Sequence, residues 1–321
     1  MNGAASGTSR RAFLGRAAGA AVAVGAAGVG AGAITGSAAA ADQRTYTAGR
    51  FALDIDGVNV GLVAGVDGGD RCGNVVDDPP TSGDIVQRKH LAGVKYEDFT
   101  VQVGSAMGKP MYDWIKASFD KGYVRKSGAI SAGDFNYKEK HRSEASTMSI
   151  SSITCPPLDR SSTEPVYLPV DISCPKVTTV KPSGADIRGS LGSKQKAWLP
   201  SNFVFVVGGA DTSRVASIDS FTWKCTVASD GSVLCDVSDI GVTFPQADVS
   251  SWRQWYQSML SGADDERDGA LTLIGAQGGV VCTFSFENLG LYRLLPTVNK
   301  RVKAEMYCER ASWDLAKGKG S

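Results

Sequence analysis

The sequence repeats one pattern twice, 141 residues apart, and this repetition limits the possible folds more than any other feature. Trp114 and Trp255 each lie in a segment whose apolar residues recur at helical spacing. The same offset places Gly128-Ala-Ile130 on Gly269-Ala-Leu271 without a gap. A pattern that recurs at a fixed distance predicts two copies of one structural unit in tandem.

Each copy contains one segment with clear helical signals. In the first, Pro110 stands where a helix can begin, and in the second Asp248 is a candidate N-cap. Gly122 and Gly262 follow the two segments and predict their ends. We expect the aromatic stripes to pack in the core, and a platform for a glycan or another ligand is the alternative. The stripes consist of Met111, Trp114, Ile115 and Phe119, and of Trp252, Trp255, Tyr256, Met259 and Leu260.

The rest of each copy alternates like β-strands. Phe51, Leu53 and Ile55 alternate with small or polar residues before Gly57, and residues 202–209 form a similar run that ends in glycine. These patterns predict a mainly β fold in which one α-helix packs against each sheet. Residues 176–201 are rich in Gly, Pro, Lys and Ser, as expected of a linker. The predicted domains are therefore 42–175 and 202–321.

The first 41 residues read as an export signal. Ser9-Arg-Arg-Ala-Phe-Leu-Gly15 is typical of a twin-arginine motif, with Arg10, Arg11, Phe13 and Leu14 as its defining residues. Residues 17–41 carry no charge and are weakly hydrophobic for their length, so a stable transmembrane segment is not expected. Small residues before Asp42 suit a signal peptidase. We expect the twin-arginine machinery to export the chain folded, to a secreted or cell-envelope location; an ordinary Sec signal or an uncleaved anchor is the alternative.

Charge and motifs argue against several function classes. The chain has 34 Lys+Arg and 33 Asp+Glu, and removal of residues 1–41 takes away three arginines and no acid, leaving a net charge of −2. Such a balance gives no electrostatic footprint for nucleic acid. The sequence contains no common catalytic motif and only two histidines, His90 and His141, which we expect to be structural or solvent-exposed in loops. The acidic loop 264–268 lacks the glutamate of an EF-hand. We therefore expect no enzyme activity, no cofactor and no metal site.

Seven cysteines fit an oxidising compartment. Cys225 and Cys235 flank Asp230-Gly231, a strong hairpin signal, and each lies five residues from Asp230. They could therefore face each other across the two strands and form a disulfide, and two buried free thiols are the alternative. Cys155 and Cys174 are a weaker candidate pair.

Several short motifs resemble those of contractile-phage tail tube proteins and their relatives in extracellular injection systems. In the first half these are Phe51-Ala-Leu-Asp-Ile-Asp-Gly57, Lys89-His-Leu-Ala-Gly93, Asp98-Phe-Thr-Val-Gln-Val103, Trp114-Ile115 and Lys126-Ser-Gly-Ala-Ile130; the second half matches more loosely through its helix, Gly269-Ala-Leu-Thr-Leu-Ile274 and Lys303-Ala-Glu-Met-Tyr307. The resemblance covers most of residues 42–321. Tail tube proteins ordinarily lack an export signal and carry one such domain, so the chain departs from the family in both respects.

This resemblance implies two tandem tail-tube-like β-sandwich or barrel domains. It further implies a non-enzymatic structural protein that self-assembles into rings or stacked tubes, with a sixfold arrangement of domains. Two domains per chain would then give a trimer with pseudo-sixfold symmetry. The alternative function is a secreted monomeric β-rich binding module for a glycan or surface ligand.

Overall fold

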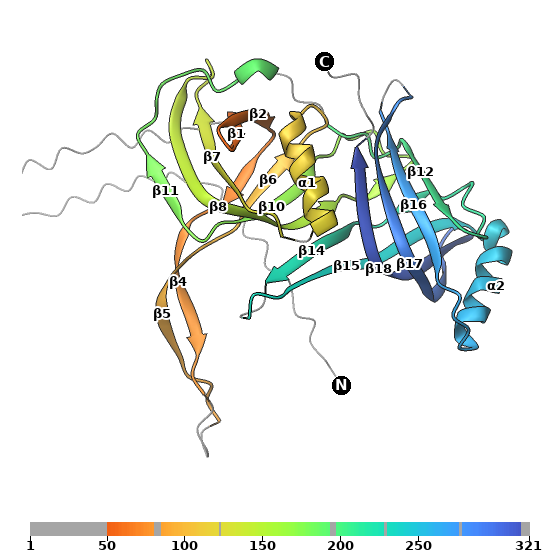
Figure 1. Cartoon of the computed structure of the whole chain (residues 1–321). Helices are drawn as coiled ribbons and strands as arrows, with labels where there is room; N and C mark the ends of the chain where they lie inside the picture. The colour runs from red at the N-terminus through yellow and green to blue at the C-terminus, as the bar shows by residue number, and fades with distance from the viewer. Residues whose placement is uncertain are drawn as a thin grey trace, which may run out of the picture. The chain divides into compact units, whose positions relative to one another are not determined.

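The computed structural model describes residues 50–79, 85–121, 123–192, 197–227, 230–275 and 278–315. The signal residues Arg10, Arg11, Phe13 and Leu14 lie outside these ranges. Strands dominate the described residues, and two α-helices accompany them, which confirms the expected mainly β class (Figure 1). The helices are α1 (Lys109–Lys121) and α2 (Val249–Leu260), and both carry the predicted tryptophans in the core.

Among the described residues, the first half of the molecule (50–192) holds eleven strands and the second half (197–315) seven. The strands of the first half are β1 (Arg50–Ile55), β2 (Val58–Val63), β3 (Val66–Gly68), β4 (Arg71–Asp77), β5 (Lys89–Tyr96), β6 (Phe99–Val103), β7 (Lys126–Gly133), β8 (Glu139–Cys155), β9 (Leu158–Asp159), β10 (Leu168–Ser173) and β11 (Val177–Val180). Those of the second half are β12 (Phe203–Val207), β13 (Ser217–Ile218), β14 (Phe221–Val227), β15 (Val233–Pro245), β16 (Arg267–Ile274), β17 (Val280–Thr297) and β18 (Arg301–Leu315).

The two halves share one plan of strand pairing. β7 pairs with β1 and β8 in the first half, as β16 pairs with β12 and β17 in the second. The registers agree as well, because Ile55 lies opposite Gly128 where Val207 lies opposite Gly269. The repeat that the sequence predicts is therefore a repeat of hydrogen-bonded architecture.

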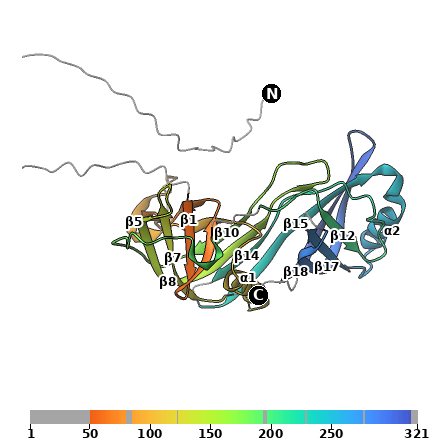
Figure 2. The same ribbon diagram turned by 90° about the horizontal axis from the view of Figure 1, so that it is seen from above.

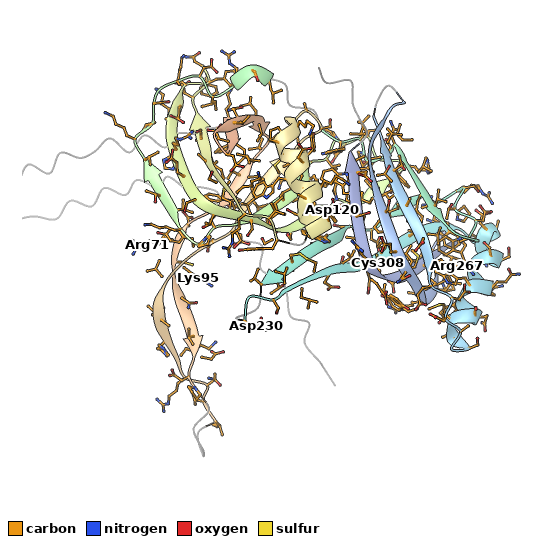
Figure 3. The ribbon with its side chains drawn as sticks, in the orientation of Figure 1. Arg71, Lys95, Asp120, Asp230, Arg267 and Cys308 are labelled. Atoms are coloured by element: carbon orange, nitrogen blue, oxygen red, sulfur yellow. A yellow bond between two sulfur atoms is a disulfide. The ribbon has the colours of Figure 1, made fainter. Side chains whose placement is uncertain are left out.

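The register also shows where the halves differ in length. Val66 lies opposite Val101, and Ile218 lies opposite Val242 in the same way. Equivalent residues are thus 152 apart before the hairpin of each half and 141 apart after it. The hairpin β4–β5 is therefore eleven residues longer than its counterpart β14–β15, and it forms a separate two-stranded sheet (Figures 1 and 3).

The two halves are joined more closely than a flexible linker implies. β14 pairs with β8, so strands of both halves belong to one sheet, and residues 46–321 form one compact unit (Figure 2). The expected linker 176–201 differs from the prediction in part, since Val177–Val180 form β11 on β8. Ile187 and Trp198 in the same segment are buried. Its composition is that of a linker, but apolar residues spaced along it attach it to the core. The division into two separate domains stays a prediction.

Candidate assembly interface

Helix α1 packs with one face on its own half and with the other on the second half. Phe119 carries most of the second contact, and its ring centroid lies 4.6 Å from that of Trp223, 6.3 Å from Phe284 and 6.3 Å from Trp313. Tyr112, two turns earlier, meets Trp313 edge to face at 6.1 Å. Such aromatic contacts in a buried site stabilise by burial of apolar area and by ring geometry. The contact is therefore a hydrophobic interface between the halves.

A salt bridge marks the edge of this contact. Lys116 Nζ lies 2.5 Å from Asp314 Oδ1 and 3.4 Å from the carbonyl oxygen of Trp313. The hydrogen bond to Asp314 raises the pKa of Lys116. The side chain of Lys116 is about half exposed and that of Asp314 about two-thirds exposed, so the pair adds little stability and mainly fixes where the helix lies on β18.

A β-ladder forms the second part of the contact between the halves. β14 runs antiparallel to the end of β8, with Phe221 opposite Cys155 and Lys224 opposite Ser152. The hydroxyls of Thr154 and Thr222 are 2.9 Å apart across the ladder. Backbone pairing covers the edge of β8 at the point where β7 no longer pairs with it.

The equivalent surface of the second half lies open in this chain. Arg253, Gln257 and Leu260 of α2 stand at the positions of Tyr112, Lys116 and Phe119 of α1, and all three are exposed. Leu260 is 61% exposed, whereas Phe119 is 7% exposed. The prediction that Leu260 packs in the core is therefore wrong for the single chain. Its position in the stripe corresponds to the outer face of α1, which packs against the other half.

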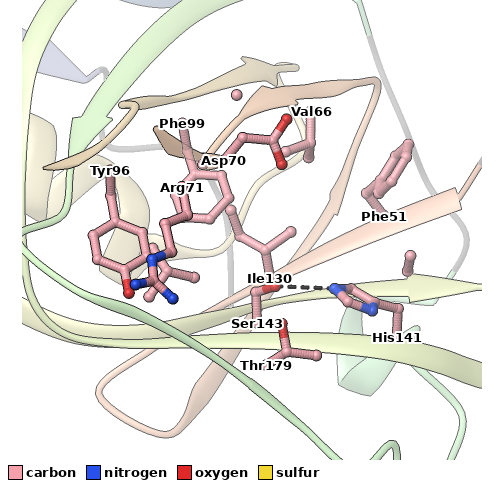
Figure 4. A pocket seen from close by; sticks show the side chains of 14 residues that line it. Phe51, Val66, Asp70, Arg71, Tyr96, Phe99, Ile130, His141, Ser143 and Thr179 are labelled. Atoms are coloured by element: carbon pink, nitrogen blue, oxygen red, sulfur yellow. Dashed lines mark hydrogen bonds between the residues drawn. The ribbon is translucent and has the colours of Figure 1, made fainter. Parts of the chain in front are cut away.

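A cavity of about 540 Å³ lies in the first half, where residues of β1, β3, β4, β5, β6, β7, β8 and β11 line it (Figure 4). Ser143 lies opposite Thr179 in this cavity, at the register that Phe284 and Trp313 occupy in the second half. Arg71 takes the place of Trp223. Small and polar side chains thus stand where the second half has three aromatic rings. Further residues of the lining include Phe51, Tyr96, Phe99, Ile130 and His141.

Two strand edges complete the set of open surfaces. Among the described strands, β4 pairs with β5 alone, so the backbone of Arg71 and Cys72 has one unpaired side. Within the described residues, residues 293–296 of β17 pair with β18 on one side only. On the other side, the pairing of β17 with β16 stops at Leu289 and does not reach them. Residues 293–296 stand at the positions that β14 covers on β8.

The structure confirms the disulfide between Cys225 and Cys235, which lie directly opposite each other on β14 and β15. Asp230 stands at the turn between them (Figure 3). The weaker pair is wrong, because Cys155 and Cys174 are both free and buried. Desolvation by burial raises the pKa of Cys174 to about 12.

Both histidines are exposed, as expected, but they lie in strands rather than in loops. His90 in β5 contacts Asp78, and the ring of His141 in β8 lies 3.0 Å from Ser143 Oγ at the cavity wall. The charged segments around the two histidines form strands because each pairs with a neighbouring strand, β5 with β4 and β8 with β7.

The acidic loop between α2 and β16 is tied to its surroundings. Arg267 pairs with Asp265 at 3.0 Å, and Tyr307 donates a short hydrogen bond to Glu266, which raises the pKa of Tyr307 to about 12. No cluster of metal-ligating side chains occurs within the described ranges. None of the helices in the described residues is long and apolar enough to cross a membrane.

No family model and no curated protein matches this chain. The comparison with solved structures found a match to a chain of the sheath–tube complex of an extracellular contractile injection system, PVC, in the extended state. It is 17% identical with a TM-score of 0.34, and the match covers 44% of this chain and 94% of that chain.

The cavity and the open helix face were not predicted from the sequence. A signal for both exists in the same offset that revealed the repeat, since Ser143 stands where Phe284 recurs and Leu260 where Phe119 recurs. Comparison of the two copies position by position would have marked the exchange of large for small side chains.

Proposed function

We propose that this protein is an exported, non-enzymatic structural protein that assembles with further copies of itself into rings through two tail-tube-like units. One observation carries the proposal. The halves of a single chain contact each other through α1 and β14, and the equivalent surfaces in the opposite direction, on α2 and β4, are uncovered. Each chain therefore has one open surface on its second half, around α2, and one open surface on its first half, around β4. By equivalence with the contact inside the chain, the first of these surfaces should fit the second on another copy. Such head-to-tail contacts generate rings when the rotation closes and filaments when it does not.

The proposed ring contains three chains. The family resemblance implies six positions, and each chain supplies two similar units. In the competing arrangement one half builds the ring and the other decorates it, which would require six chains. The projecting hairpin β4–β5 exposes Val75, Leu91 and Val94, and we propose this surface as a contact between stacked rings.

Export rests on Arg10, Arg11 and the uncharged segment behind them. The Cys225–Cys235 disulfide supports an oxidising destination, because disulfides persist outside the cytoplasm. Assembly after export would avoid the passage of a ring through the membrane.

Size-exclusion chromatography with light scattering, followed by negative-stain microscopy of the exported protein, tests the proposal. Rings or short tubes are expected. A monomer at every concentration would favour the second candidate, a binding module, in which the cavity lined by Arg71, Tyr96 and His141 would take a polar ligand.

A further inference from the structure

We propose that the cavity of the first half receives helix α2 of a second copy of this chain. Strand β4, next to the cavity, pairs with β17 of that second copy. This inference rests on the proposed self-assembly and specifies its interface. It follows from the contact that the chain already makes between its own halves.

The helix contact follows from equivalent positions. In one chain, Phe119 of α1 sits among Trp223, Phe284 and Trp313 of the second half. Leu260 of α2 is the equivalent of Phe119, and Arg71, Ser143 and Thr179 are the equivalents of the three aromatic residues. These three residues line the cavity, which is open in the isolated chain. The surface that should receive α2 is thus the one that is hollow.

The chemistry of the two surfaces agrees. The outer face of α2 carries the charged Arg253 where α1 carries the aromatic Tyr112, and the polar Gln257 where α1 carries Lys116. The cavity is correspondingly more polar than the aromatic site, and at about 540 Å³ it is too large for one leucine side chain alone. It would hold Leu260 at its base and Gln257 at its rim. Of the three side chains on this face, Leu260 gains the most free energy from burial, because its surface is apolar.

The strand contact follows from the ladder between β14 and β8. In that ladder Lys224 lies opposite Ser152, and the equivalent pair between two copies is Cys72 opposite Arg293 of the second copy. Phe221 lies opposite Cys155, and the equivalent pair is Gly69 opposite Pro296. Pro296 has no amide hydrogen and cannot donate a backbone hydrogen bond, so the ladder is complete only at the other positions of 293–296. Both strand edges are open in the described residues, and an unpaired edge is a template for strand addition.

This register makes the contact testable with a cysteine that the chain already has. Cys72 is a free, half-buried cysteine. Arg293→Cys would place a second cysteine directly opposite it on the neighbouring copy, at a spacing that suits a cross-strand disulfide. Under mild oxidation this variant should give covalent species of two and three chain masses on non-reducing gels. Three chains should be the limit, since the ring closes there.

Two control variants keep this experiment specific. The double variant Cys72→Ser/Arg293→Cys should lose the ladder of covalent species. Arg188→Cys replaces another exposed arginine, outside the inferred interface, and should give no more cross-linking than the wild type. Equal cross-linking of the Arg188 and Arg293 variants would overturn the inferred register.

A mixing experiment tests the helix contact. Leu260→Arg disables the helix face and Ser143→Arg fills the cavity, so each variant alone should be monomeric. A mixture contains one intact cavity and one intact α2, and it should give a dimer that cannot grow further. Circular dichroism should show that both variants are folded.

The outcomes separate this inference from the proposed function. If the wild type forms oligomers that both single variants retain, the interface is wrong and self-assembly stands. If the wild type is monomeric at every concentration, self-assembly fails and the interface with it.

Discussion

Two tryptophans perform the same structural task in the two halves. Trp114 Nε1 donates to the carbonyl oxygen of Val124 at 2.9 Å, and Trp255 Nε1 donates to that of Asp265 at 2.8 Å. Both indoles are buried, and both acceptors lie ten residues after the donor. Each bond fixes the loop that leads from the helix into the next strand. The repeat therefore extends to single hydrogen bonds.

Replacement of either tryptophan by phenylalanine should destabilise the fold by a similar amount. Trp114→Phe and Trp255→Phe each remove a buried donor and leave its acceptor unpaired, which costs about 1–3 kcal/mol of unfolding free energy. Urea denaturation measures this loss. Phe135→Leu, at an exposed position, is the control and should change stability by less than about 0.5 kcal/mol. A loss in one tryptophan variant alone would contradict the equivalence of the two bonds.

The buried thiols should be unreactive in the folded protein. Desolvation raises the pKa of Cys282 to about 12 and that of Cys308 to about 11. A raised pKa lowers the thiolate fraction at pH 8, for a pKa of 12 by about a thousandfold relative to an ordinary cysteine. Alkylation at pH 8 followed by peptide mapping should label Cys72 first. Rapid labelling of Cys282 without unfolding would show that the core is more open than this structure.

The hairpin β14–β15 is held by one disulfide near its turn. Cys225→Ser/Cys235→Ser removes a loop closure of sequence separation 10, so the loss of stability should not exceed about 2–3 kcal/mol. Denaturation with and without reductant measures it. Peptide mapping of the exported protein without reductant should find the two cysteines linked, and two free thiols would contradict the assignment.

The elements that the sequence predicts are those whose pattern is local. Alternation over Phe51–Ile55 marks β1, and the apolar stripe that includes Trp252 and Trp255 marks α2, because burial of one face imposes a period on each. β11 was missed within a linker-like composition, since its pairing with β8 is decided by residues more than thirty positions away. The β4–β5 hairpin was also missed, because most of its side chains are exposed and leave no apolar period.

The candidate interface was predictable only in part. The helical stripe includes Leu260 correctly as an apolar position on a recurring face. The sequence pattern does not distinguish a side chain that packs in its own core from one that packs against another half or another copy. That distinction requires the exposed fraction of the side chain, which the structure supplies.

Export of the chain should depend on the paired arginines Arg10 and Arg11. Arg10→Lys/Arg11→Lys keeps the charge of the segment but removes the guanidinium groups of the motif, so precursor should accumulate in the cytoplasm. Immunoblots of cytoplasmic and exported fractions measure this. Unchanged secretion of the variant would contradict twin-arginine export and leave the Sec alternative.

In the proposed ring, the two halves would be specific for each other. Their contact surfaces differ, with aromatic residues such as Trp223 and Trp313 in the second half and small or polar residues such as Thr179 in the first. Differences of this kind favour alternation of first and second halves around a ring over contacts between like halves. A ring built in this way needs no second protein to close.

Native mass spectrometry of the exported wild-type protein tests the proposed ring. The smallest closed assembly should contain three chains, with higher species at multiples of three when rings stack. A smallest assembly of six chains, with no three-chain species, would show that only one half builds the ring. A strictly monomeric protein at every concentration would rule out self-assembly.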